Sequence, residues 1–216
     1  MSIAYDRIYF FGDSITLGCN DSLDLGWPGR VCRGMTKDGR GVAVYNLGIN
    51  GDTSGDIDAR WYTEMMARNR GSAGLLVFAF GFNDAAHKNS DRAQVELELS
   101  VKTSRKIMSL AQGISKVMWI GPTPLDETVN PLDAPDGRWL MYNEEIEKYD
   151  SAYAYLANQM KIDYLSLYQE YRDSPRYQAA LVAGDKVHPA DDGYAMIAES
   201  VTNWGAWRKL FRTSLA

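Results

Sequence analysis

Cysteine is scarce in this sequence of 216 residues, which contains only Cys19 and Cys32. Their spacing fits neither a CxxC redox pair nor a zinc site, so we expect two free thiols in a reducing compartment. A chain of this length buries roughly 70 to 75% of the surface that it exposes when unfolded. It therefore needs no disulfide to build a core, and the sequence predicts a single domain over residues 1–216.

Excess positive charge and long hydrophobic runs are also missing. The net charge is −5, and no basic run interleaved with aromatic residues is present, which argues against a nucleic-acid partner. The longest apolar segment, residues 75–82, is far too short to span a bilayer, and Asp6 and Arg7 precede any long apolar stretch. The sequence therefore predicts a cytoplasmic protein without a membrane span, and it leaves the oligomeric state open.

Short apolar runs alternate with amphipathic segments along the chain, which is typical of a parallel sheet covered by helices on both faces. We expect strands over residues 7–12, 42–48, 74–81, 116–121 and 161–167. We expect helices over 29–37, after Asp52 or Thr53, over roughly 91–112, along the apolar face from Trp139 to Met160, and from Pro189 onward. The sequence thus predicts a three-layer α/β/α fold.

Polar residues follow the first three predicted strands. Ser14 comes after the first strand, Gly48 closes the second, and Asn83 follows the third. Each of these alone also fits an ordinary turn or helix cap. If the strands are parallel, however, all three lie at one carboxyl edge, where open α/β sheets bind ligands. Ser14 is then a candidate nucleophile, and the N–H groups of Ser14 and Gly48 with the amide of Asn83 supply three donors for an oxyanion.

A serine nucleophile needs a base, and the chain has only two histidines. Asp185 stands three residues before His188, where its carboxylate can accept from one ring nitrogen and leave the other free for Ser14. His87 has no such partner upstream, and we expect it at the rim of the site, in solvent or touching substrate. The alternative for Asp185 is a cap of the C-terminal helix.

With these residues in place, the sequence resembles the GDSL or SGNH hydrolase family of serine esterases and lipases. The four matching blocks are Gly12-Asp13-Ser14-Ile15, Asn46-Leu47-Gly48, Gly81-Phe82-Asn83-Asp84 and Asp185-Lys186-Val187-His188-Pro189. Ile15 replaces the family's usual leucine and Lys186 a common glycine, and neither change removes a reacting group. The Gly-x-Ser-x-Gly elbow of the α/β-hydrolases is absent.

The resemblance implies a flavodoxin-like fold with a five-stranded parallel sheet and no cofactor or metal. It implies Ser14 as nucleophile, His188 as base and Asp185 as the residue that orients the base. It also implies that Gly48 and Asn83 donate to the oxyanion together with the N–H of Ser14.

The residues predict a serine hydrolase that cleaves a small-molecule carboxylic ester or thioester through an acyl-enzyme on Ser14. Two alternatives stay open, namely an acyltransferase with the same triad and a non-catalytic module that binds an acyl or phosphate ligand. Residues 122–137 contain four prolines and no periodicity, and we expect them to wall the acyl or leaving-group pocket together with residues 17–27. Asp13 and Asp84 are expected to hold their own turns by side-chain to backbone hydrogen bonds.

Overall fold

The computed structural model describes residues 3–69, 71 and 74–211. A five-stranded parallel sheet runs through its centre, in the order β10-β7-β5-β1-β4. The strands are β1 (Arg7–Gly12), β4 (Ala43–Gly48), β5 (Leu75–Ala79), β7 (Val117–Ile120) and β10 (Asp163–Leu165). Numbered along the chain, these strands take the order 2-1-3-4-5, which is the flavodoxin-like arrangement. All five predicted strands are confirmed, each close to its expected bounds.

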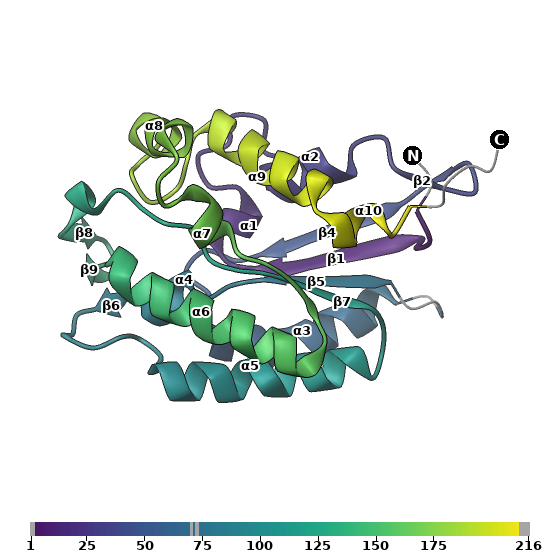
Figure 1. The fold of residues 1–216 in the computed structure, drawn as a ribbon, viewed down its shortest axis with the longest axis horizontal. Coiled ribbons are helices and arrows are strands. Elements are labelled where there is room, and N and C mark those ends of the chain that lie inside the picture. The colour runs from purple at the N-terminus through teal and green to yellow at the C-terminus, as the bar shows by residue number, and fades with distance from the viewer. Residues whose placement is uncertain (1–2, 70, 72–73, 212–216) are drawn as a thin grey trace.

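Helices cover both faces of the sheet (Figure 1). One face carries α3 (Ser54–Arg68), α5 (Leu97–Gln112) and α6 (Asn143–Met160), and the other carries α2 (Gly26–Cys32) and α9 (Asp191–Asn203). Because successive side chains of a strand point to opposite faces, β1 contributes to two cores. Its Tyr9 and Phe11 join the cluster around Trp61, whereas Ile8 and Phe10 join the cluster around Trp27. This double burial explains why the strands read as continuous apolar runs.

The described residues also form one short 3₁₀ helix, η1 (Glu127–Val129), and five short α-helices. The α-helices are α1 (Ser14–Leu17), α4 (Phe82–Ala85), α7 (Leu167–Tyr171), α8 (Pro175–Ala183) and α10 (Gly205–Arg208). Among them, α1 and α4 directly follow β1 and β5, so they begin at the carboxyl edge of the sheet. Cys19 and Cys32 are free thiols, as predicted.

Several helix boundaries differ from those expected. α3 begins where predicted, because Thr53 and Asp56 form a capping box at its start. The helix expected over 29–37 is wrong at both ends, since α2 ends at Cys32 and residues 36–37 form β2 (Thr36–Lys37), which pairs with β3 (Arg40–Gly41). α5 begins later than expected, at Leu97, and α9 begins just after Pro189.

A small antiparallel sheet includes the last part of the irregular loop expected over residues 122–137, most of which lies outside helices and strands. It consists of β6 (His87–Lys88), β9 (Gly137–Leu140) and β8 (Leu132–Ala134), in that order. The expected helix from Trp139 is therefore wrong in its first turn, because Trp139 lies in β9, opposite Leu132. Figure 1 shows this sheet beyond the carboxyl ends of the parallel strands.

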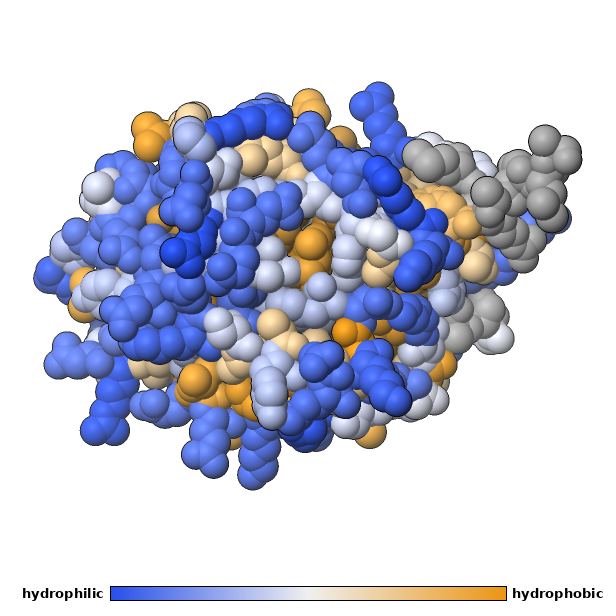
Figure 2. Space-filling view, viewed as in Figure 1, coloured by the Kyte–Doolittle hydropathy of each residue, from blue (hydrophilic) through white to orange (hydrophobic). Residues whose placement is uncertain are grey.

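The surface is mainly polar on the face seen in Figure 2, where hydrophobic residues form small, separate areas. This agrees with the gathering of large apolar side chains in the two cores. In the part of the chain that the structure describes, no helix is both long enough and apolar enough to cross a membrane.

Candidate active site

Ser14 lies at the point where β1 ends and α1 begins. Asp13 caps α1, and its Oδ1 accepts from the N–H of Ile15 at 3.0 Å, so the prediction that Asp13 holds its own turn is confirmed. A Cβ atom on Gly12 would lie 2.1 Å from Oγ1 of Thr16, so glycine is needed for this tight entry into the helix. Burial of Asp13 raises the pKa of its carboxyl to about 6.

The structure brings His188 against Ser14, from 174 residues away along the chain. The Nε2 atom of His188 lies 2.8 Å from Oγ of Ser14, and its Nδ1 atom lies 2.8 Å from Oδ2 of Asp185. The other carboxylate oxygen of Asp185 accepts from the backbone N–H groups of His188 at 2.6 Å and of Val187 at 3.0 Å. The imidazole is therefore held between a carboxylate and a hydroxyl, which is the arrangement that activates a serine.

The same contacts keep Asp185 ionised. Partial burial is the largest single influence and works to raise the pKa of its carboxyl, but the hydrogen bonds from His188 and Asn20 and the charge of His188 together outweigh it and lower that pKa well below its usual range. An ionised Asp185 favours the proton on Nδ1 of His188, which leaves Nε2 free to accept from Ser14.

Asn83 lies near Ser14, at the start of α4. Its side chain is nearly buried, and one amide hydrogen donates to the backbone carbonyl of Asp52 at 3.0 Å. The backbone carbonyl of Asn83 accepts from Gln94 at 2.8 Å. Because an amide carries two hydrogens, the second one is available to a ligand in the hollow that Asn83 lines together with Ser14.

Gly48 does not line the hollow beside Ser14, where its predicted role as an oxyanion donor would place it. Its N–H donates to Oδ1 of Asn46 at 3.1 Å. A Cβ atom at position 48 would lie 2.2 Å from the backbone nitrogen of Leu17, so this glycine allows α1 to pack closely on β4. The structure thus gives Gly48 a packing role.

Gly51 takes the position expected for Gly48. It lines the hollow with Ser14 and Asn83, and its φ of 82° is one that glycine adopts without strain. Within residues 3–69, 71 and 74–211, its N–H has no hydrogen-bond partner. Sequence reasoning missed Gly51, although Asn50-Gly51 is a recognised turn signal.

The prediction that Asp84 holds its own turn is wrong, because its carboxylate accepts from residues of other elements. Its Oδ1 accepts from the N–H of Ser54 at 2.8 Å, and its Oδ2 accepts from Ser100 at 2.5 Å and Tyr153 at 2.9 Å. The carboxyl is fully buried, and burial raises its pKa. Asp84 therefore ties α4 to the start of α3, which directly follows the loop that carries Gly51.

Arg60 joins that loop to the end of β1. Its Nε donates to Oδ2 of Asp52 at 2.6 Å, and its Nη2 donates to the carbonyl of Gly12 at 3.1 Å. Burial raises the pKa of Asp52, and the bond from Arg60 opposes this effect. No signal in the sequence singled out Arg60, because the carbonyl of Gly12 that it joins to Asp52 lies 48 residues away along the chain.

A hollow of about 170 Å³ opens beside Ser14 and His188. One wall comes from the small antiparallel sheet, so the expectation that residues 122–137 wall the pocket is confirmed for residues 132, 134 and 136. Residues 17–27 and His87 are not among the described residues that line it. The complete lining is Ser14, Asn50, Gly51, Phe82, Asn83, Leu132, Ala134, Asp136, Trp139, Met141, Val187 and His188.

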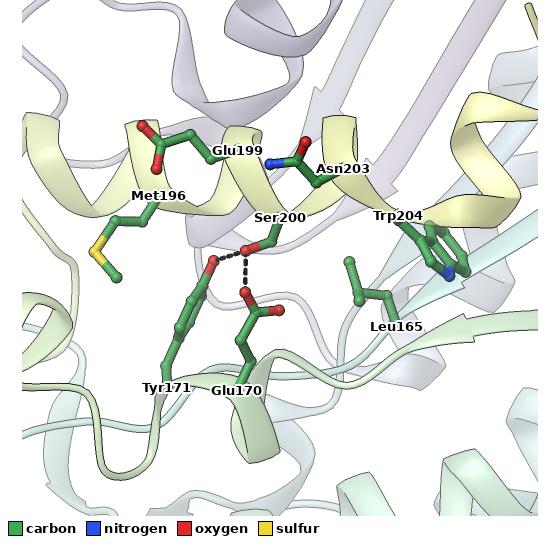
Figure 3. A pocket seen from close by; sticks show the side chains of 8 residues that line it. All are labelled: Leu165, Glu170, Tyr171, Met196, Glu199, Ser200, Asn203 and Trp204. Atoms are coloured by element: carbon green, nitrogen blue, oxygen red, sulfur yellow. Dashed lines mark hydrogen bonds between the residues drawn. The ribbon is translucent and has the colours of Figure 1, made fainter.

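A second hollow, of about 380 Å³, is larger but lacks the chemistry of the first (Figure 3). It lies between α7 and α9, and its serine, Ser200, bonds to the hydroxyl of Tyr171 at 2.5 Å and to the carboxylate of Glu170. No histidine lines it. Among the described residues, no group of three acidic, histidine or cysteine side chains is placed to hold a metal ion in either hollow.

The doubly wound sheet presents a hydrogen-bonded serine, histidine and aspartate at its carboxyl edge, an arrangement that recurs in serine hydrolases of several unrelated folds. A sequence profile of the GDSL-like lipase/acylhydrolase family matches residues 10–196, and the chain belongs to this family. The predicted resemblance is therefore confirmed. A comparison with curated proteins found no match.

Solved structures share the fold. A lipase/acylhydrolase from Enterococcus faecalis has 22% identity and a TM-score of 0.72, over 96% of this chain and 98% of that one. A member of the lipolytic G-D-S-L family from Veillonella parvula has 18% identity and a TM-score of 0.69, over 93% and 98%. An acetylxylan esterase from Geobacillus stearothermophilus, solved as a catalytic mutant, has 19% identity and a TM-score of 0.66, over 93% of each chain.

Proposed function

We propose that this chain hydrolyses a small-molecule carboxylic ester through an acyl-enzyme on Ser14. One observation carries the proposal: His188 is hydrogen-bonded at 2.8 Å to both Oγ of Ser14 and the carboxylate of Asp185. Membership of the GDSL-like lipase/acylhydrolase family supports it. So does the likeness of the fold to acetylxylan esterases.

In the first half of the reaction, Oγ of Ser14 attacks the acyl carbon while Nε2 of His188 takes its proton. Asp185 stabilises the imidazolium that results. The carbonyl oxygen becomes an oxyanion, and the N–H groups of Ser14 and Gly51 and the amide of Asn83 donate to it. When the intermediate collapses, the bond to the leaving oxygen breaks, and His188 gives that oxygen the proton.

In the second half, water replaces the alcohol. His188 takes a proton from the water while the oxygen of that water attacks the acyl carbon of the ester on Ser14. The same donors stabilise the second oxyanion. Collapse then breaks the bond to Oγ of Ser14, which recovers its proton from His188, and the carboxylic acid leaves. A thioester would follow the same steps, with a thiol in place of the alcohol.

The experiment is active-site labelling together with hydrolysis. We expect a fluorophosphonate probe to label the protein once per chain, Ser14→Ala to abolish the labelling, and only the parent to hydrolyse p-nitrophenyl butyrate. Mass spectrometry of the labelled peptide locates the adduct. Labelling that persists in Ser14→Ala would contradict the assignment of the nucleophile. A parent that binds the ester without turnover would identify a binding module instead.

A further inference from the structure

Trp139 forms part of the wall of the hollow beside Ser14, and its indole contacts Lys88 of β6 and Asp136 of the turn between β8 and β9. The Nε1–H donates to Oδ1 of Asp136 at 3.2 Å, and Nζ of Lys88 lies 4.7 Å from the ring centroid. Lys88 also donates to Oδ2 of Asp136 at 2.7 Å. Only 9% of Trp139 is exposed. A hydrogen bond and a cation–π contact thus hold the ring in one position.

The wall around Trp139 is apolar. Phe82, Leu132, Met141 and Val187 line the hollow with it, together with Ala134. Outside the reacting groups, the polar lining is Asn50, Gly51 and Asp136, and the carboxylate of Asp136 is already bonded to Lys88 and to Trp139. A charged acyl group pressed against this wall would lose its water without gaining a partner, which is costly.

The size of the hollow limits the length of the acyl chain. An engineered apolar cavity of about 150 Å³ holds one benzene molecule, which has six carbon atoms. The hollow beside Ser14 has about 170 Å³. With the carbonyl oxygen toward Gly51 and Asn83, the carbon chain is the part of the ester that the apolar wall of this hollow would contact.

We propose that the site selects short, uncharged acyl groups of up to about six carbon atoms, and that Trp139 sets this upper limit. The inference rests on the proposed function, since the acyl group must reach Ser14. Trp139 acts as a specificity-determining residue, because a longer chain meets the fixed indole before its carbonyl carbon comes within reach of Oγ.

The test varies the acyl chain and keeps the leaving group constant. We would measure kcat/KM for p-nitrophenyl acetate, butyrate, hexanoate, octanoate and decanoate. For the parent, we expect the butyrate value to exceed the decanoate value at least tenfold. Trp139→Ala should raise the ratio of the kcat/KM for the decanoate to that for the butyrate at least tenfold, because removal of the indole makes room for a longer chain. A succinate monoester should be hydrolysed at least tenfold more slowly than the butyrate.

Trp204 provides the matched control, since it lines the second hollow (Figure 3). Trp204→Ala should leave the chain-length ratio within twofold of the parent. If Trp139→Ala does not fold, Leu132→Ala, the cross-strand neighbour that lines the same wall, should shift the ratio in the same direction.

The inference is overturned if the kcat/KM of the parent is higher for the decanoate than for the butyrate. It is also overturned if the parent hydrolyses esters but a folded Trp139→Ala or Leu132→Ala variant leaves the ratio of the two kcat/KM values unchanged. The failure of the proposed function itself would look different from either of these results. In that case, no ester of any length is hydrolysed and a fluorophosphonate does not label Ser14.

Discussion

Arg60 provides a test of how the proposed oxyanion donors are positioned, because it is not among the residues that line the hollow. Its guanidinium joins the carboxylate of Asp52 to the carbonyl of Gly12, and the carbonyl of Asp52 in turn accepts from the amide of Asn83. It thus sets the loop that carries Gly51 against the end of β1. We predict that Arg60→Ala lowers kcat and leaves KM within about threefold, since the donors act mainly in the transition state.

The magnitudes follow from the contacts that are lost. The side chains of Arg60 and Asp52 are 15% and 10% exposed. Breaking a fully buried pair costs about 3–5 kcal/mol, and for this slightly exposed pair we expect about 2–3 kcal/mol, which lowers Tm by about 4–12 °C. Displacement of a positioning group by ~1 Å costs about 10²-fold in rate. The bond from Ile49 N–H to Gly12 remains, so we expect kcat to fall about 10-fold to 100-fold.

The assay compares kcat, KM and Tm with those of a matched control. Arg7 is 12% exposed and also bonds one carboxylate and one carbonyl, on Asp6 and Arg68, but at the opposite end of β1. Arg7→Ala should lower Tm and leave kcat within twofold. Guanidinium ions at low concentration should restore part of the activity of Arg60→Ala alone. If kcat of folded Arg60→Ala stays within threefold of the parent, or if Arg7→Ala loses as much, the reasoning is refuted.

Three further predictions concern other side chains. His188→Ala should lower kcat at least about 10³-fold, whereas His87→Ala should stay within about tenfold of the parent; the reverse ranking would move the base to His87. Asn83→Ala should lower kcat about 10²-fold to 10³-fold with KM nearly unchanged, and a raised KM at constant kcat would make it a substrate-binding residue instead. Burial works to raise the pKa of Asp21, but the hydrogen bonds from Arg30 and the backbone lower it to about 2. Since this lies below the value of about 3.9 in an unfolded chain, Asp21 stabilises the fold by about 2–3 kcal/mol above pH ~4 and loses this effect as the pH falls toward 2. Asp21→Asn should therefore lower the free energy of unfolding at pH 7, and its difference from the parent in urea titrations should shrink below pH ~4; a constant difference would contradict the sign.

The sheet was predictable because its signal is local. The strands β1, β5 and β7 are buried on both faces, so the sequence shows a short apolar run for each of them. The order of those runs along the chain also indicates that Ser14 and Asn83 share one edge. The loop at residues 185–188 is equally local, since the bonds from Asp185 to His188 and Val187 lie within it.

The loop that carries Gly51 was not predictable to the residue. The sequence indicates where β4 ends, but the chain continues through a turn in which the N–H of Asp52 donates to the carbonyl of Ile49. The direction of each N–H depends on the φ and ψ angles of that turn, so the residue types do not distinguish Gly48 from Gly51 as a donor.

Trp139 shows how a periodic pattern misleads. Its spacing from Tyr142 and Ile146 fits one helical face, and Ile146 does lie in α6. The pairing of β9 with β8 and with Lys88 of β6 decides the structure of Trp139 instead. The partner strand β6 lies far away in the sequence, and local periodicity carries no information about it.

The separation of 174 residues between Ser14 and His188 has a consequence for the protein during its synthesis. A chain emerges from the ribosome with its N-terminus first, so Ser14 is exposed long before its base exists. Until His188 has emerged and docked, the serine is an ordinary, unreactive hydroxyl. Under the proposed function, a nascent or C-terminally cleaved chain would therefore lack esterase activity, and the appearance of that activity would report that Ser14 and His188 have come together.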